Sequence, residues 1–80
     1  MLDELKTARK VVGIKQLRKS LKGGQIRCAF LAEDADPNLT DPIRTECAAL
    51  GVELVCVPTM EQLGKACGIS VGAAAAGLLA

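Results

Sequence analysis

Apolar positions change their spacing along this chain, and the changes predict alternating helices and strands. Residues 14–22 carry apolar side chains every three to four positions, which places them on one face of a helix. Residues 26–32 are instead apolar throughout except at Arg27, as expected of a strand covered on both faces. Residues 53–57 repeat that pattern and are followed by Pro58, which ends a strand. The pattern predicts an α/β protein.

Glycine, proline and capping residues set the predicted boundaries. Gly23 follows the first long helical segment and is a common helix-ending residue. Thr40 or Asp41 is expected to cap the next helix, with Pro42 at its first position. Thr59 opens another helix, because a Thr followed three positions later by Gln forms a capping box. The predicted elements are helices over 2–9, 14–22, 42–50 and 60–67, strands over 11–12, 26–32 and 53–57, and a last segment over 71–79.

The last segment can be read in two ways. Its alanines favour a helix, whereas its two glycines and the helix before it favour a buried strand. The apolar run at 71–80 is about half the ~20 residues that a membrane-spanning helix needs, so it is predicted to be a core element. The alternation predicts a single domain over residues 1–80, folded as a three-layer α/β/α sandwich.

Cysteine and histidine content excludes several kinds of site. The four cysteines (Cys28, Cys47, Cys56 and Cys67) form no C-x-x-C pair, and the chain has no histidine, so zinc patterns fail and no metal or cofactor is expected. Each cysteine has apolar neighbours, which predicts buried thiols and a reducing, cytoplasmic setting. The first ten residues are charged, unlike a signal peptide.

Enzymes and one class of nucleic-acid binder are disfavoured by the residues that are missing. Without histidine, no Ser-His or Cys-His nucleophile pair can form, and no other nucleophile–base pair stands out. Phe30, the single aromatic residue, lies within an apolar run, so the chain has no exposed ring for base stacking. We therefore expect a protein that is not an enzyme.

Charge is divided unevenly along the chain. Residues 1–27 hold eight Lys/Arg against two acids, a balance of +6, and residues 28–80 hold two against seven, a balance of −5. In the basic helix, Lys15, Lys19 and Lys22 gather about a quarter to a third of a turn from the apolar face. A helix N-terminus also favours anions. The alternatives are a phosphate-binding face and an ordinary solvated helix.

Two loops also carry candidate chemistry. The acidic segment 33–36 could hold a divalent metal or accept hydrogen bonds from a nucleic-acid base. Its spacing does not fit an EF-hand, and taken alone the segment is better explained as a solvated loop. In the segment 68–72, Ile69 and Val71 lie between glycines. They are either an exposed apolar contact surface or the start of a strand.

Three segments together resemble one known family. Residues 13–19 resemble a G-x-N-E-x-x-K signature, residues 32–37 an A-x-D-x-[DE]-P loop, and residues 63–71 an L-G-x-A-x-G-[IV] element. These motifs are typical of the kink-turn RNA-binding ribosomal proteins, represented by an archaeal large-subunit protein, and of their small bacterial relatives. The resemblance spans residues 5–80. It implies a mixed four-stranded sheet with 71–79 mostly strand.

The resemblance also implies a ligand. Family members bind a kink-turn, in which two RNA helices bend around a short bulge beside tandem G·A pairs. The implied RNA-binding residues are Gly13 for close backbone approach, Lys15, Gln16 and Lys19 for base edges and phosphates, Asp36 for a flipped-out nucleotide, Ile69 and Val71 for unstacked bases, and Gly68 and Ser70 for backbone or hydroxyl contacts. This chain departs from the signature by having Lys15-Gln16 in place of Asn-Glu.

The sequence therefore predicts a cytoplasmic, non-enzymatic protein that binds kink-turns in structured RNA. The partner is expected to be ribosomal or regulatory RNA, with no membrane association, and the protein is expected to be a monomer. The alternative is a protein–protein interaction module on the same fold, which the acidic remainder of the chain favours.

Overall fold

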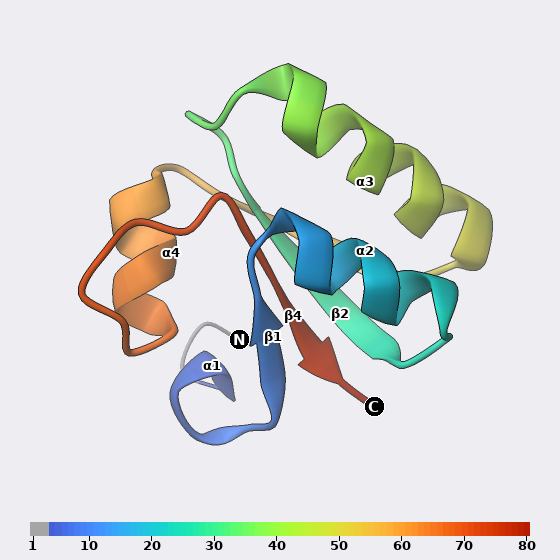
Figure 1. The fold of residues 1–80 in the computed structure, drawn as a ribbon, viewed down its shortest axis with the longest axis horizontal. Coiled ribbons are helices and arrows are strands. Elements are labelled where there is room, and N and C mark those ends of the chain that lie inside the picture. The colour runs from blue at the N-terminus through green and yellow to red at the C-terminus, as the bar shows by residue number, and fades with distance from the viewer. Residues whose placement is uncertain (1–3) are drawn as a thin grey trace.

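Four strands form one sheet at the centre of the molecule (Figure 1). The computed structural model describes residues 4–80. The strands are β1 (Lys10–Val12), β2 (Ile26–Ala32), β3 (Glu53–Val57) and β4 (Ala75–Leu79). They lie in the order β1-β4-β2-β3, with β2 and β3 parallel and β4 antiparallel to both of its neighbours. The sheet is thus mixed and four-stranded, as expected.

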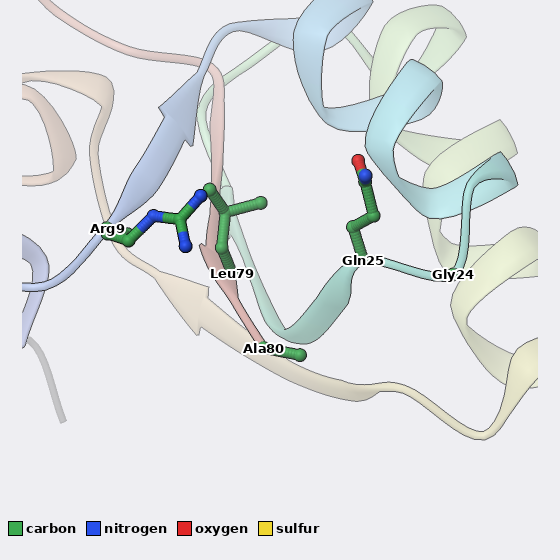
Figure 2. A pocket seen from close by; sticks show the side chains of 5 residues that line it. All are labelled: Arg9, Gly24, Gln25, Leu79 and Ala80. Carbon is green, nitrogen blue, oxygen red and sulfur yellow. The ribbon is translucent and has the colours of Figure 1, made fainter.

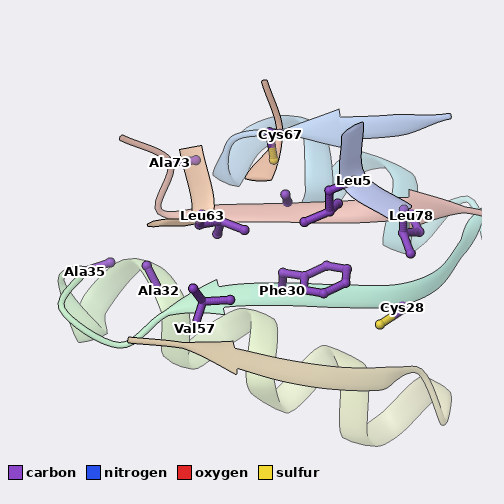
Figure 3. Close-up of a cluster of buried hydrophobic side chains, with 11 residues drawn as sticks. Leu5, Cys28, Phe30, Ala32, Ala35, Val57, Leu63, Cys67, Ala73 and Leu78 are labelled. Atoms are coloured by element: carbon purple, nitrogen blue, oxygen red, sulfur yellow. The ribbon is translucent and has the colours of Figure 1, made fainter. Parts of the chain in front are cut away.

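Helices cover both faces of this sheet. The helices are α1 (Glu4–Thr7), α2 (Ile14–Lys22), α3 (Pro37–Leu50) and α4 (Met60–Ala66). Leu5 of α1 and Leu63 of α4 are buried with Phe30 on one face, a cluster that Figure 3 shows. Leu17 of α2 is buried with Leu31 on the other face, where α3 also packs. Adjacent β2 residues thus enter opposite cores, and the predicted three-layer α/β/α sandwich is confirmed.

Gly77 lets α2 approach the sheet closely. A Cβ atom at this position of β4 would lie 2.6 Å from Leu17 Cδ1, so the buried Leu17 side chain would have to move. Leu17 and Leu21 are both fully buried beneath α2. The apolar face of α2 is thereby held on the sheet, and its basic face points outward.

The predicted start of α3 was wrong. The helix begins five residues earlier than expected, at Pro37, with Asp36 as its N-cap and Pro42 inside it. Asp36-Pro37 and Asp41-Pro42 are both a capping residue followed by proline, so local sequence could not separate them. The earlier start places Thr40 within the helix, where it is buried against the core. Gly51 ends α3 in the left-handed conformation, as expected.

Two other predicted elements are several residues longer than the observed ones. The helix expected over 2–9 is observed at Glu4–Thr7, and residues 2 and 3 lie outside the described part of the chain. The strand expected over 71–79 begins at Ala75. Before it, the Ala73 N–H donates to the Met60 carbonyl at 3.0 Å, so this backbone group serves α4 rather than the sheet.

One of the four predicted buried thiols is exposed. Cys28, Cys47 and Cys67 are buried, whereas Cys56 is exposed. Cys56 lies on β3, an edge strand, and the Arg44 guanidinium donates to its Sγ at 3.3 Å. An edge strand lacks a second neighbouring strand, so apolar neighbours in sequence do not ensure burial there. Within residues 4–80, no helix is long and apolar enough to cross a membrane.

Candidate functional site

Three segments that are far apart in sequence meet at one end of the sheet. The Gly13 N–H, at the start of α2, donates to the Ala75 carbonyl at 2.8 Å. The Ala32 N–H, just before the acidic loop, donates to the Ala74 carbonyl at 2.9 Å. Figure 1 shows the start of α2, the loop that leads into β4 and the connection to α3 at this same end. The backbone therefore brings the start of α2 and the start of the acidic loop to residues 74 and 75, which follow the segment 68–72.

The start of α2 presents polar side chains and free backbone donors. Gly13 is the N-cap, with φ at 103°, a conformation that side-chain-bearing residues rarely adopt. No side chain caps this end of the helix, and its first turn holds no acid. Lys15, Gln16 and Lys19 are all exposed. The N–H groups of the first turn and these side chains together form a surface suited to anions.

Arg18 is a basic residue of α2 that sequence analysis left out of the candidate site. It lines a shallow hollow of about 320 Å³ together with Lys15, Lys19 and Lys22. Its Nε donates to Glu46 Oε1 of α3 at 2.9 Å, so the neighbouring helix holds the guanidinium in place. These four residues stand at positions i, i+3, i+4 and i+7 of the helix, and that spacing was the available signal.

The acidic loop has a structural role at two helix starts. Asp36 Oδ1 accepts from the Asn38 N–H at 2.9 Å and caps α3. Asp34 Oδ1 accepts from the Met60 N–H at 2.8 Å, at the first residue of α4. Both side chains remain exposed. Within the described residues, no group of three or more Cys, Asp or Glu side chains is arranged to hold a metal ion.

The segment 68–72 is a loop that exposes apolar side chains. Ile69 is 36% exposed and Val71 is 68% exposed. The loop lies against α4, because the Ile69 N–H donates to the Gly64 carbonyl at 3.1 Å and a Cβ at Gly64 would lie 2.1 Å from the Val71 carbonyl oxygen. The strand-start interpretation is therefore wrong. The alternative, an apolar contact surface, stays a prediction, and Gly68 and Ser70 beside these side chains are also exposed.

A second hollow lies at the opposite end of the sheet. It has a volume of about 350 Å³ and is lined by Arg9, Gly24, Gln25, Leu79 and Ala80 (Figure 2). Arg9 is its single charged lining side chain, whereas four cationic side chains line the hollow on α2. The basic surface is therefore concentrated on α2.

Comparison with known proteins identifies the family. Residues 2–79 match the model of the Ribosomal protein L7Ae/L30e/S12e/Gadd45 family. The chain belongs to this family. An RNA-binding protein of Bacillus pumilus is 42% identical over 69 residues, which cover 86% of this chain and 84% of that relative. Large ribosomal subunit protein eL8 of Halobacterium salinarum is 36% identical over 84 residues, covering 99% of this chain and 70% of eL8.

A solved structure from the same comparison supports the L7Ae-family fold. The Giardia lamblia 15.5kD RNA binding protein superimposes with a TM-score of 0.90 at 26% sequence identity, covering 99% of this chain and 70% of that one. The resemblance inferred from the three sequence motifs is thus confirmed at the level of family and fold.

Proposed function

We propose that this protein binds RNA and that its target is a kink-turn. The observation that carries the proposal is the Gly13–Ala75 backbone hydrogen bond, which fixes the basic start of α2 beside the loop that precedes β4. In the proposed interface, the cationic side chains of α2 and the apolar side chains of the loop 68–72 contact the same RNA. A sharply bent RNA offers matching groups, because phosphates and base edges lie beside bases that have lost their stacking partners. RNA-binding relatives and a ribosomal relative of the same family support this assignment.

Each polar residue at the start of α2 has a distinct part in the proposed contact. Lys15 and Lys19 donate to guanine O6 and N7 and to nearby phosphates. Gln16 can both donate to and accept from the edge of a G·A pair. Gly13 allows the RNA to approach the backbone, because no side chain stands in front of the helix N-terminus. Because Lys15-Gln16 replaces the Asn-Glu pair of the family signature, recognition depends more on charge and less on a fixed side-chain geometry.

The two loops complete the proposed interface. Ile69 and Val71 cover unstacked bulge bases, while Gly68 and Ser70 offer backbone and hydroxyl contacts. Asp36 uses Oδ1 to cap α3, which leaves Oδ2 of the same carboxylate to accept from a flipped-out nucleotide. In this role the protein is a cytoplasmic monomer without cofactor or catalytic group, and its partner is ribosomal or regulatory RNA.

The proposal is tested by titrating the protein against a kink-turn RNA and a regular duplex of matched length at the same salt concentration. We expect the kink-turn to bind at least roughly tenfold more tightly, since the duplex offers phosphates but no opened base edges. Equal affinity for the two RNAs would contradict kink-turn recognition.

A protein-interaction module on the same fold is the second candidate. Leu50, at the end of α3, is 55% exposed, and Leu39 at the start of α3 is 47% exposed. These side chains lie on the acidic part of the chain, which is poorly suited to RNA. Partners that remain bound in a pull-down after nuclease treatment would favour this second function.

A further inference from the structure

The loop 68–72, which is proposed to cover unstacked bases, runs back along α4 from the end of the helix to its start (Figure 1). The Ile69 N–H donates to the Gly64 carbonyl at 3.1 Å near the end of the helix. At the start of the helix, the Ala73 N–H donates to the Met60 carbonyl at 3.0 Å. Backbone groups of the loop are thus bonded to both ends of α4, so the position of the loop follows the position of the helix.

The first turn of α4 has little anchoring from its own side chains. The helix has seven residues, too few to be stable in isolation. Its first buried side chain is Leu63, and the three residues before it are exposed, namely Met60, Glu61 and Gln62. The Thr59 hydroxyl accepts from the Gln62 N–H at 3.1 Å, but this bond lies within the start of the helix itself. The position of this turn on the sheet therefore depends on contacts from other parts of the chain.

Asp34 supplies such a contact from the acidic loop. Its Oδ1 accepts from the Met60 N–H at 2.8 Å. This N–H is at the first residue of α4 and has no acceptor within the helix, so the carboxylate satisfies it and interacts favourably with the helix dipole. The next residue, Ala35, is buried in the cluster that also contains Leu63 and Ala73 (Figure 3). The acidic loop is therefore packed in place, and Asp34 connects it to the residue on which the second loop depends.

We propose that Asp34 is a positioning residue for RNA recognition, which acts through Met60 and sets the position of the loop 68–72. The inference rests on the proposed kink-turn function and adds to it a residue that acts without contacting the RNA. An acid near a polyanion repels it, so charge alone predicts that loss of Asp34 strengthens RNA binding. A positioning role predicts the opposite for kinked RNA, because a displaced loop no longer places its apolar side chains over the unstacked bases.

The experiment titrates variants of Asp34 against a kink-turn RNA and a straight duplex of matched length. Asp34→Ala removes the acceptor, whereas Asp34→Asn keeps an oxygen that can accept from the Met60 N–H. We expect Asp34→Ala to weaken binding of the kink-turn about three- to tenfold without weakening binding of the duplex, and Asp34→Asn to retain most of the wild-type affinity. Glu33→Ala, which removes a neighbouring exposed acid, is the charge control and should weaken neither complex.

Two further comparisons separate positioning from a general loss of stability. Gly51 ends α3 in the left-handed conformation, with φ at 69°, at the other end of this helix from the acidic loop. Gly51→Ala therefore strains the backbone elsewhere and should keep the wild-type preference for kinked RNA. The effect of Asp34→Ala on this preference should also disappear in a protein that already carries Ile69→Ala and Val71→Ala, because the side chains to be positioned are then absent.

The inference is overturned if Asp34→Ala keeps the wild-type preference for kinked RNA, or if Gly51→Ala loses as much of it. It is also overturned if the effect of Asp34→Ala persists after both apolar side chains of the loop have been removed. Thermal melting shows whether each variant is folded at the assay temperature. If Asp34→Ala is unfolded, Asp34→Glu replaces it, since it keeps the charge and moves the carboxylate by one methylene. An unchanged preference in Asp34→Glu then counts against the inference.

Failure of kink-turn recognition is a different result, namely equal wild-type affinity for kinked and straight RNA. The link from Asp34 to the loop is then tested in the free protein, by NMR measurement of hydrogen exchange at the Ala73 amide. Asp34→Ala should speed this exchange, because the Met60 carbonyl that accepts from Ala73 is less firmly held, and Asp34→Asn should leave it near the wild-type rate. An unchanged exchange rate in Asp34→Ala would refute the positioning role.

Discussion

The Asp34 carboxylate accepts a hydrogen bond from the Met60 N–H at 2.8 Å and so joins the acidic loop to the start of α4. The same Met60 accepts a hydrogen bond from the Ala73 N–H through its carbonyl, which ties down the loop before β4. One residue of α4 thus connects the two loops of the candidate site. The acidic loop has a structural role before any ligand binds.

Replacing Asp34 with alanine should destabilise the protein and loosen this connection. The N–H of Met60 would lose a charged acceptor at a helix N-terminus, which costs about 1 kcal/mol in the free energy of unfolding. Urea denaturation measures the change. Glu33→Ala, which removes an exposed neighbouring carboxylate, is the matched control and should lie within about 0.5 kcal/mol of wild type. Equal stability of the two variants would show that this hydrogen bond does not contribute to the free energy of unfolding.

Gly64→Ala should displace the loop 68–72, which packs against α4 at this residue. An added Cβ would lie 2.1 Å from the Val71 carbonyl oxygen, so the backbone of the loop must move. We expect a loss of about 1–3 kcal/mol in the free energy of unfolding, despite the better helix propensity of alanine. Gly23→Ala is the control, because its Cβ would meet only the Gln25 side chain, at 3.5 Å. Thermal denaturation of both variants checks the prediction, which fails if Gly64→Ala is as stable as wild type.

Ile69→Asp should weaken binding of kinked RNA far more than binding of a straight duplex. An aspartate there replaces an apolar cover for unstacked bases with a negative charge, whereas a regular duplex has no such bases to cover. Leu50→Asp introduces the same charge at another exposed apolar position, at the far end of α3. Titration of both variants against both RNAs separates a local effect from a general electrostatic one. An equal loss of affinity for kinked RNA in the two variants would show that Ile69 is not part of the RNA-binding site.

Lys15→Ala and Lys19→Ala should each cost about 1–3 kcal/mol in the free energy of binding kinked RNA. Both lysines are proposed to contact base edges, so their loss should also reduce the preference for kinked over straight RNA. Lys65→Ala, on α4, removes one exposed positive charge away from α2 and serves as the control. Fluorescence anisotropy with each RNA gives the affinities. If both α2 variants keep the wild-type preference for kinked over straight RNA, these lysines contact phosphates and not base edges.

The four thiols should react at two very different rates. Cys56 is exposed, whereas burial raises the pKa of Cys28, Cys47 and Cys67 above the usual value of 9.0. In native protein a thiol-specific reagent should therefore modify Cys56 quickly and the other three cysteines slowly. Cys56→Ser should remove the fast reaction. These three thiols ionise at a lower pH in the unfolded protein than in the folded one. The free energy of unfolding should therefore fall as pH rises above about 9. Mass spectrometry measures the extent of labelling at each cysteine over time. Four equal labelling rates in native protein would contradict the structure.

Much of the fold follows from local sequence signals. The observed bounds of α2, β2 and β3 coincide with the predicted ones, because an apolar period, a continuous apolar run and flanking Gly or Pro residues all act within a few positions. The start of α3 did not follow in this way. Asp36 and Asp41 offer the same local cap. Asp36 is the one that the structure uses, and Thr40 is buried within the helix, a burial that the local sequence does not specify.

The candidate site divides along the same line. The basic face of α2 and the acidic loop are visible in the sequence, because charge and helical spacing are local properties. The pairing of Arg18 with Glu46 joins residues 28 positions apart, and Asp34 and Met60 are separated by 26. Such contacts depend on how α3 and α4 pack on the sheet. Apart from Arg18, which was missed, the charged side chains were therefore predictable from the sequence, whereas their partners were not.

By itself, the sequence determined which residues are basic, which face of α2 is apolar and where α2, β2 and β3 begin and end. Tertiary structure alone decided that Gly13, Ala32 and Ala75 meet at one end of the sheet. Strand order β1-β4-β2-β3 causes this meeting, because antiparallel β4 begins where its neighbours β1 and β2 end. Hydrogen bonds between strands are long-range in sequence, and no local pattern specifies which strands pair.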